Sequence, residues 1–220
     1  MAIFVAGATG QTGRHVVTQL VEQNIPVKAL VRDLEKAREM LPATAELVVG
    51  DVLEPATFDR HLEGCSGLIC ATGASPSFDP TGPYKIDYEG TKNLVDCAKA
   101  HNIEHFILVS SLCVSKFFHP LNLFWLVLYW KKQAESYIQA SGVPYTIVRP
   151  GGLKNEDNSE PIVMKGADTL FDGSIPRLKV AKVCVEALSQ PAAKSTIVEI
   201  VTDPEAQPQS WEQLFGNVAA

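Results

Sequence analysis

The chain of 220 residues lacks several patterns that would place it in a large functional class. Its five cysteines lie far apart in the sequence, at Cys65, Cys70, Cys97, Cys113 and Cys184. No pair has the Cys-x-x-Cys spacing, so we expect reduced thiols and neither a disulfide framework nor a metal site. No basic cluster extends beyond Lys131-Lys132 and the formal charge is −6, which argues against a nucleic-acid partner.

The sequence also has little that indicates a membrane span or an export signal. The longest near-apolar run, from Leu121 to Trp130, is too short to cross a bilayer. A β-rich apolar segment begins at Ala2, which leaves no room for a targeting segment ahead of it. No internal repeat, low-complexity tract or shift in composition marks a boundary. We therefore expect a cytoplasmic protein in which residues 1–220 form one domain.

Short apolar runs alternate with amphipathic stretches along the whole chain. Strands that are buried on both faces of a parallel sheet are apolar almost continuously, and six runs fit that description. They are Ile3–Ala6, Val27–Val31, Leu47–Val49, Leu68–Ala71, Phe106–Val109 and Tyr145–Val148. Later in the chain we predict a helix at Pro176–Ser189, a strand at Thr196–Val201 and a short helix at Ser210–Phe215. This alternation predicts an α/β protein with a doubly wound, mostly parallel sheet.

The connections between these elements carry further signals. Asp33 and Asp87 are expected to be helix N-caps, and Pro55 suits the first turn of a helix. Two connections, Thr72–Pro83 and Gly151–Ile175, are long and rich in glycine, proline or polar residues. Both follow the carboxyl end of a predicted strand, where ligands bind in open α/β sheets. We expect these loops to border a functional site.

A glycine-rich motif follows the first predicted strand and opens a helix, with the sequence Gly7-Ala-Thr-Gly10-Gln-Thr-Gly13. In a βαβ unit such glycines allow a tight turn and let the backbone approach a pyrophosphate at the helix N-terminus. A glycine-rich turn without a ligand is the alternative. The position between a strand and a helix predicts a dinucleotide site.

The end of the second predicted strand indicates which dinucleotide binds. Arg32 stands where NAD-binding proteins place an acid, and a guanidinium there can pair with the 2′-phosphate of NADP. Arg14 could add positive charge nearby. Asp51, after the third predicted strand, suits an adenine contact, although a helix cap would explain it as well. These residues favour NADPH, and the alternative for Arg32 is a solvated surface arginine.

Several segments together resemble a known family. Gly-Ala-Thr-Gly-Gln-Thr-Gly, Val-Arg-Asp, Val-Val-Gly-Asp-Val-Leu and Tyr-Thr-Ile-Val-Arg-Pro-Gly-Gly are similar to the NAD(P)H-binding, NmrA-like group of atypical short-chain dehydrogenase/reductases, over residues 1–202. Two branches look closest: biliverdin reductase B, also called flavin reductase, and the dehydrogenase-like domain of the chloroplast inner-envelope import component. The resemblance implies an NAD(P)-binding Rossmann fold that holds NADPH through Gly7, Thr9, Gly10, Gln11, Thr12, Gly13, Arg32, Asp51 and Val52. It further implies a nicotinamide end bordered by Ala71, Thr72, Gly73, Ser110, Ser111, Pro150, Gly151 and Gly152.

The catalytic residues of typical short-chain dehydrogenases are incomplete in this sequence. Those enzymes use a serine on one strand and a Tyr-x-x-x-Lys on the next helix, and Ser111 matches the serine. Tyr88 and Lys92 have the required spacing but precede the serine, so we reject them. Tyr129 follows at a suitable distance, but its lysine, Lys132, is three residues on. Tyr129 with Lys132 is one candidate pair, and the absence of a dedicated acid is the favoured interpretation.

An enzyme without a dedicated acid suits acceptors that need hydride but little help with the proton. Flavins, biliverdin-like tetrapyrroles and quinones qualify, because their conjugation stabilises the charge that hydride transfer leaves. We therefore predict an NADPH-dependent reductase of a planar acceptor, with Phe117, Phe118 and Trp125 as candidate stacking residues. The alternative is a protein that senses NADP(H), or an assembly factor at a membrane. A sugar-nucleotide epimerase is a weak third option.

The aromatic run Asn122–Tyr137 has three explanations: core or dimer packing, a wall of the acceptor site, or a membrane or protein contact through residues 117–132. We expect a monomer or a homodimer. On the helix in this run, outward positions are predicted for Lys131, Lys132, Glu135 and Gln139.

Overall fold

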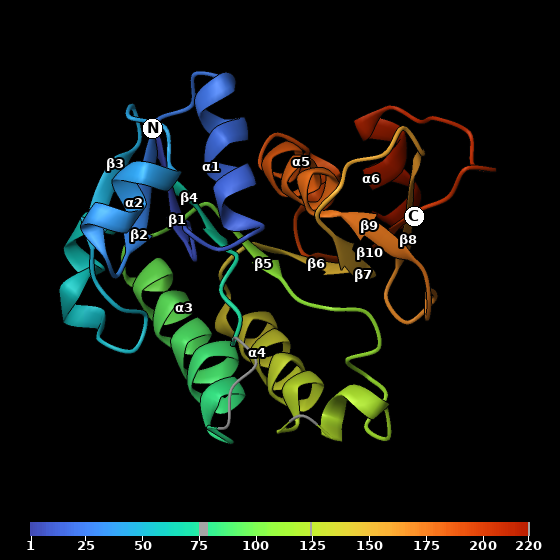
Figure 1. The fold of residues 1–220 in the computed structure, drawn as a ribbon, viewed down its shortest axis with the longest axis horizontal. Helices are drawn as coiled ribbons and strands as arrows, with labels where there is room; N and C mark the ends of the chain where they lie inside the picture. Colours follow the sequence, from blue (N-terminus) through green and yellow to red (C-terminus); the bar gives the residue numbers. More distant parts are fainter. Residues whose placement is uncertain (75–78, 124, 220) are drawn as a thin grey trace.

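An eight-stranded sheet forms the centre of the molecule (Figure 1). A computed structural model describes residues 1–74, 79–123 and 125–219. The strand order is β3-β2-β1-β4-β5-β6-β10-β8, and all neighbours are parallel except β8, which runs antiparallel to β10. The bounds are β1 (Ala2–Ala6), β2 (Val27–Val31), β3 (Glu46–Val49), β4 (Cys65–Cys70), β5 (His105–Val109), β6 (Tyr145–Pro150), β8 (Ile162–Gly166) and β10 (Thr196–Thr202). The prediction of a doubly wound, mostly parallel sheet is confirmed.

Helices cover both faces of this sheet. They are α1 (Gly13–Glu22), α2 (Leu34–Met40), α3 (Gly90–Ala100), α4 (Val127–Ser141), α5 (Arg177–Ala187) and α6 (Trp211–Ala219). Helices α1 and α5 lie side by side on one face, and α3 and α4 lie on the other (Figure 1). None of the helices in the described ranges is long and apolar enough to cross a membrane.

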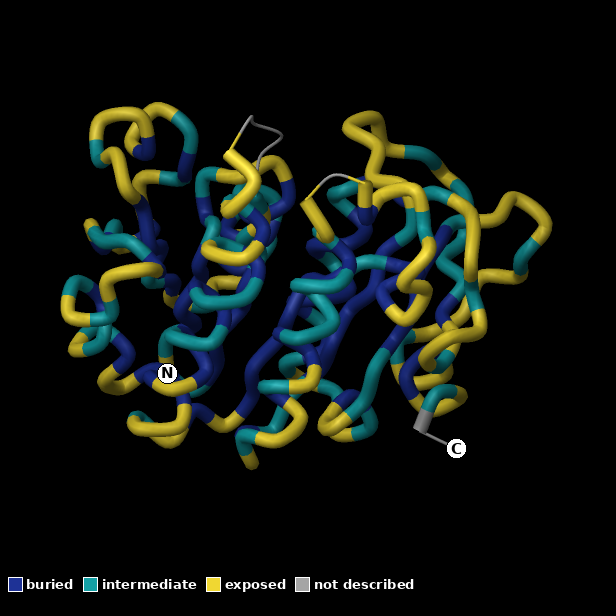
Figure 2. The backbone as a smooth tube through the Cα atoms, turned by 90° about the horizontal axis from the view of Figure 1, so that it is seen from below, coloured by how far each residue is buried: buried dark blue, intermediate teal, exposed yellow. Residues whose placement is uncertain are grey.

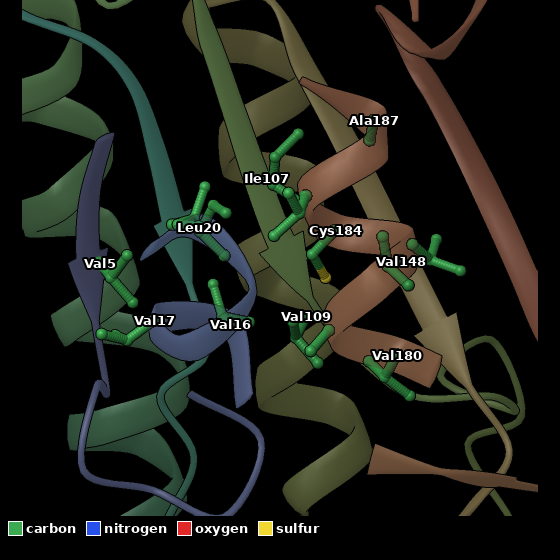
Figure 3. Packing of buried hydrophobic residues seen from close by; sticks show 14 of the residues in the cluster. Val5, Val16, Val17, Leu20, Ile107, Val109, Val148, Val180, Cys184 and Ala187 are labelled. Atoms are coloured by element: carbon green, nitrogen blue, oxygen red, sulfur yellow. The ribbon is translucent and has the colours of Figure 1, made fainter. Parts of the chain in front are cut away.

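Side chains of each central strand alternate between two cores, one under each layer of helices. Ile3 and Val5 of β1 belong to the core beneath α1 and α5, whereas Phe4 belongs to the core beneath α3. Figure 3 shows the first core, where Leu20 and Cys184 lie between their helices and the strands. The central strands β1, β4, β5 and β6 are almost entirely buried, and Figure 2 shows buried backbone in the middle of the molecule with exposed segments around it. Burial on both faces explains why the strand sequences are apolar without alternation.

The expected caps are partly confirmed. Asp33 precedes α2, and its carboxylate accepts a hydrogen bond from the amide of Lys36 at 3.1 Å. Pro55 begins the short 3-10 helix η1 (Pro55–Thr57). The prediction for Asp87 is wrong, because this residue lies inside the π-helix η3 (Tyr84–Glu89), which continues into α3. Its carboxylate is buried against a lysine from α4, a contact that the local sequence does not reveal.

The long connection predicted at Gly151–Ile175 is not a simple loop. It contains β7 (Gly152–Lys154) and β8, and it leads into β9 (Ser174–Pro176). Strand β8 forms because the exposed edge of β10 offers it a partner, and β7 pairs with β9 over three residues. In the other long connection, Thr72–Pro83, residues 75–78 lie outside the described residues. The helices predicted at Pro176–Ser189 and Ser210–Phe215 correspond to α5 and α6.

His105 makes the stability of this fold dependent on pH. The ring is 3% exposed on β5, its Nε2 lies 2.8 Å from the hydroxyl of Thr146, and burial together with Lys194 lowers the pKa to about 4. Between pH 6.5 and 4 the unfolded chain binds a proton at this site and the folded chain does not. We predict that the free energy of unfolding falls by up to about 3 kcal/mol across this interval as the pH is lowered.

Urea denaturation at a series of pH values checks this prediction. The variant His105→Gln should lose this component of the pH dependence, whereas His61→Gln should follow the wild type. An unchanged pH profile in His105→Gln would contradict the assignment.

Candidate functional site

A cleft of about 500 Å³ opens along the carboxyl ends of β1 to β4. It is the place where ligands bind in open α/β sheets. Nine of the predicted cofactor residues line it: Gly7, Thr9, Gly10, Arg32, Asp51, Val52, Ala71, Thr72 and Gly73. Lys36, Gly50, Ala74, Gly82 and Ile86 also line it and were not predicted. Lys36 lies in the first turn of α2, four residues after Arg32, and a second cation so close to Arg32 was the available signal.

Two glycines of the motif lie so close to other backbone atoms that there is no room for a side chain. Gly7 has a φ of +77°, and a Cβ atom on it would lie 2.6 Å from the carbonyl oxygen of Ala71. A Cβ atom on Gly13 would lie 2.1 Å from the carbonyl oxygen of Gly7. Only glycine fits at either position, so α1 begins directly above the first turn. This packing leaves the backbone of the turn exposed to the cleft, which suits a pyrophosphate group.

One end of the cleft is cationic and carries a carboxylate. Arg32, directly after β2, and Lys36 of α2 line it, and both are exposed. Asp51 lines the same end, and its Oδ1 accepts a hydrogen bond from the amide of Leu53 at 2.9 Å. Asp51 therefore shapes its own loop as well as facing the cleft. Two cations beside a carboxylate fit a 2′-phosphate next to an adenine ring.

Other predicted residues lie outside the lining of this cleft. Gln11 and Thr12 lead into α1, and Gly13 and Arg14 are in its first turn. Ser111 is half-buried just after β5. Farther along the sheet, the amide of Gly151 donates to the carbonyl of Ile200 at 2.9 Å. The remaining members of the predicted nicotinamide end, away from the lining of this cleft, are Ser110, Pro150 and Gly152.

Ser110 belongs to a buried polar network beneath the site. Its hydroxyl donates to Glu135 at 2.7 Å, and the guanidinium of Arg149 binds both oxygens of Glu135 at 2.9 and 2.7 Å. Arg149 also contacts Glu199 and Asp168, at 3.1 and 2.9 Å. Arg149 and Glu135 are fully buried, so they hold α4 and β6 together. Although burial alone lowers the pKa of Arg149, the surrounding carboxylates raise it above its ordinary value.

Glu199 extends this network to the turn after β8. Its carboxylate accepts hydrogen bonds from the backbone amides of Asp168, Thr169 and Leu170, at 2.8, 2.9 and 2.7 Å. These bonds satisfy a buried carboxylate and fix the turn against β10. Phe171, the next residue, is about half exposed, and the ammonium of Lys116 lies 3.6 Å from its ring centroid.

The orientation predicted for α4 is partly wrong. Gln139 is exposed as expected, but Glu135 is fully buried in the network around Arg149. Lys131 points inward and pairs with Asp87, with 2.7 Å between Nζ and Oδ1. Lys132 is about one-third exposed and lies 3.5 Å from Glu135. The buried partners come from distant elements, which a pattern along one helix does not show.

The contacts of the candidate catalytic pair, Tyr129 and Lys132, are with other residues of α4 and of the segment before it. The amide of Tyr129 donates to the side chain of Asn122, and its ring packs edge-on against Phe117 and Trp130. Lys132 meets Glu135 instead. The lysine that reaches the region beside the cleft is Lys131, which the spacing of Tyr-x-x-x-Lys does not identify.

An exposed apolar surface lies at the start of α4 and just before it. We call it the aromatic rim, and it consists of Phe117, Phe118, Leu121, Leu123, Trp125 and Leu126. Phe118 is 98% exposed and Leu123 is 83% exposed, whereas the others are between 38% and 55%. Of the remaining run, Leu128 and Ala134 are buried. The aromatic run therefore divides into a packed half and a half that faces outward.

The fold and the cleft define a dinucleotide-binding α/β protein, and sequence comparison identifies the family. Residues 7–191 match the NAD(P)H-binding family, so the chain belongs to that family and the predicted resemblance is confirmed. The chain is 45% identical to an uncharacterized chloroplastic protein of Arabidopsis thaliana, covering 98% of this chain and 82% of that protein. It is 37% identical to the chloroplastic protein TIC 62 of Pisum sativum, covering 98% of this chain but only 46% of TIC 62.

Two further comparisons bear on activity and fold. Sanguinarine reductase of Eschscholzia californica is 30% identical, with 99% of this chain and 96% of the reductase covered. A protein of Bacillus halodurans described as a putative NAD-dependent epimerase/dehydratase has a solved structure with a TM-score of 0.87 and 25% identity. That match covers 99% of this chain and 100% of the solved chain. The Rossmann fold and an oxidoreductase family are thereby established.

The expected cytoplasmic location is contradicted by these relatives. The Arabidopsis protein and TIC 62 are both chloroplastic proteins. The sequence-based expectation relied on the absence of a recognisable leader, which is not a property of the folded domain.

Arg149 provides a test of the buried network. The variant Arg149→Met leaves Glu135 and Glu199 buried without their cation, so we predict a loss of about 3–5 kcal/mol in the free energy of unfolding. Arg38→Met removes an exposed pair with Glu35 and should change stability by less than about 1 kcal/mol. Denaturation by urea measures both. Equal stability of the two variants would show that the network does not support the fold.

Proposed function

We propose that the protein is an NADPH-dependent reductase that transfers hydride to a planar, conjugated acceptor. The observation that carries the proposal is the cleft, in which a glycine turn, two cations and a carboxylate follow one another along the strand ends. Membership of the NAD(P)H-binding family and the similarity to sanguinarine reductase support a reductase. The choice of NADPH rests on Arg32 and Lys36.

Each part of the cleft has a role in holding the cofactor. Arg32 and Lys36 bind the 2′-phosphate, and Asp51 accepts from the adenine amine. The turn at Gly7–Gly13 receives the pyrophosphate on the N-terminus of α1, with Arg14 adding charge. Ala71, Thr72 and Gly73 border the nicotinamide end, followed by Ser110 and the segment 150–152. Bound NADPH supplies the hydride.

The acceptor side explains why a tyrosine acid is dispensable. Ser111 follows β5 and orients the acceptor, and the rings of Phe117 and Trp125 lie in the rim beyond it. A conjugated acceptor spreads the charge that arrives with the hydride, so solvent can deliver the proton. The ring of Tyr129 packs against Phe117 and Trp130, the ammonium of Lys132 contacts Glu135, and neither residue has a required role in this scheme.

Turnover with defined acceptors tests the reductase. We predict that NADPH oxidation requires a flavin, a linear tetrapyrrole or a quinone, and that Arg32→Met raises KM for NADPH about tenfold or more while changing KM for NADH less than threefold. Loss of the pair between a guanidinium and the 2′-phosphate explains the selectivity. Steady-state kinetics followed at 340 nm measure both.

Two matched variants sharpen this test. Arg38→Met removes an arginine that pairs with Glu35 on α2 and should leave both KM values unchanged. Tyr129→Phe should keep turnover within about threefold, because the scheme assigns the phenol no proton transfer. No turnover with any of the three acceptor classes would overturn the proposal. A hundredfold loss in Tyr129→Phe would restore the tyrosine to the mechanism.

A second candidate function is favoured by the aromatic rim. Six large apolar side chains are exposed within residues 117–126, and residues 105–134 contain no Asp or Glu in a chain of formal charge −6. Lys116 is exposed beside them. An anionic lipid surface complements this combination, because apolar side chains enter the interface while the acidic remainder is repelled. In this alternative the protein is an NADP(H)-responsive factor that docks on a membrane.

Vesicle binding tests the rim. We predict that the protein floats with anionic phosphatidylglycerol vesicles and only weakly with phosphatidylcholine vesicles. The double variant Phe118→Ser/Leu123→Ser should bind at least fivefold less, since it removes the two most exposed apolar side chains. Leu153→Ser changes an exposed leucine on β7 and serves as the control. Equal flotation of the control and the double variant would exclude the rim as the contact.

A further inference from the structure

Three connections of the chain meet at the end of β6. They are the segment after β5, the junction of β6 and β7, and the turn between β8 and β9. The amide of Leu112 donates to the carbonyl of Pro150 at 3.0 Å, and the amide of Gly152 donates to the carbonyl of Gly173 at 2.9 Å. Ser111, to which the proposed scheme assigns the acceptor, directly precedes Leu112. The turn between β8 and β9 therefore borders the side of the site where the acceptor would lie.

Lys116 and Phe171 meet across two of these connections. The ammonium of Lys116 lies 3.6 Å from the ring centroid of Phe171, which is a cation-π contact. Phe171 is 48% exposed, and Lys116 is exposed as well. Within the ranges that the structure describes, Lys116 forms no ion pair with a carboxylate. Its charge is therefore balanced by a ring and by water, and an anion can approach it.

The backbone beneath this pair is held in a fixed conformation. The thiol of Cys113 donates to the carbonyl of Phe171 at 3.3 Å, and the three amides before Phe171 donate to Glu199. Cys113 and Asp168 have φ values of +63° and +60°, in the left-handed region that residues other than glycine rarely adopt. Strained positions of this kind persist where surrounding contacts impose them, and they cluster at ligand sites. The exposed ring of Phe171 is therefore presented by a rigid backbone.

The charges around the ammonium leave it attractive to an anion. Residues 105–134 contain no Asp or Glu. The acids that neighbouring elements direct toward this region are Asp168, Asp172 and Glu199. Asp168 and Glu199 both bind the guanidinium of Arg149, at 2.9 and 3.1 Å, which neutralises much of their charge. Asp172 is exposed, so water and salt screen it.

The cation-π contact makes the ring of Phe171 respond differently to neutral and to anionic acceptors. A planar acceptor that stacks on the face covered by the ammonium displaces the ammonium. A neutral acceptor gives the displaced cation nothing in return. An acceptor with a carboxylate or a phosphate offers it an ion pair, and the flexible stem of Lys116 lets the ammonium follow that group. The exchange therefore favours anionic acceptors.

We propose that Lys116 and Phe171 select a planar acceptor that carries an anionic group. Phe171 stacks against the conjugated ring system, and Lys116 pairs with the carboxylate or the phosphate. This inference rests on the proposed reductase and narrows its acceptor class. Flavin phosphates and linear tetrapyrroles with carboxylates are favoured over neutral quinones.

Two flavins with the same ring system test the selection. FMN and riboflavin share the isoalloxazine that accepts the hydride, and they differ in the phosphate. We predict that the wild type has a KM for FMN about fivefold or more below its KM for riboflavin, because a charge-assisted bond forms with the phosphate. Lys116→Met should abolish this preference by raising KM for FMN, while kcat stays within about twofold. Steady-state kinetics at saturating NADPH measure all of these values.

Three further variants separate the charge, the ring and the fold. Lys116→Arg keeps a cation at the ring and should retain the preference for FMN. Phe171→Leu removes the stacking surface and should raise KM for both flavins. Lys154→Met removes an exposed lysine of β7 and is the matched control, with both KM values unchanged. Because Lys116 and Phe171 are exposed, all variants should unfold at the urea concentration of the wild type.

Several outcomes would overturn the inference and leave the reductase intact. One is equal KM values for FMN and riboflavin in the wild type. Another is a wild-type preference for FMN in Lys116→Met, or an equal loss of that preference in Lys154→Met, which would assign it to the net charge of the chain. Turnover of a neutral quinone but of neither flavin would also exclude the selection. No turnover with flavins, tetrapyrroles or quinones would refute the proposed reductase itself, and this inference with it.

Discussion

Coverage of the sheet on both faces is the constraint on which the remainder of the structure depends. The central strands supply apolar side chains to two cores, and the glycine and polar residues that line the cleft follow the carboxyl ends of the strands. The carboxyl ends of neighbouring parallel strands meet at one edge, and the cleft forms there. The same constraint brings Gly7 against the carbonyl of Ala71, because β1 and β4 are adjacent. Fold and cofactor site are therefore consequences of one arrangement.

Helix α4 shows how a familiar scaffold can carry a different set of polar contacts. In place of a tyrosine and lysine that face the substrate, it contributes two inward charges at Lys131 and Glu135. Each is neutralised by a residue from another element, Asp87 or Arg149. One pair lies beside the cleft and the other beneath Ser110. This arrangement agrees with the proposed reductase, in which a conjugated acceptor stabilises the charge that hydride transfer leaves.

The relatives extend over two kinds of protein, and the chain has structural features that suit both. Sanguinarine reductase is matched along almost its whole length, which agrees with an enzyme contained within one such chain. TIC 62 is matched over 46% of its length, so there the equivalent region is part of a larger protein. The cleft suits the proposed reductase, as in the first kind of relative. The aromatic rim suits the proposed contact with a membrane. The two features occupy different parts of the molecule, and each can be altered separately.

The sequence by itself determined the strands, the glycine turn and nine of the residues that line the cleft. These features depend on local rules, because continuous apolar runs mark buried strands and a positive φ at Gly7 admits only glycine. Arg32 could likewise be located by counting from the end of a strand. Only the tertiary structure decided the burial and the ion-pair partners of Asp87, Lys131 and Glu135. Their environments depend on partners more than ten residues away in the chain, and a buried charge is stable only where the fold delivers its counter-charge.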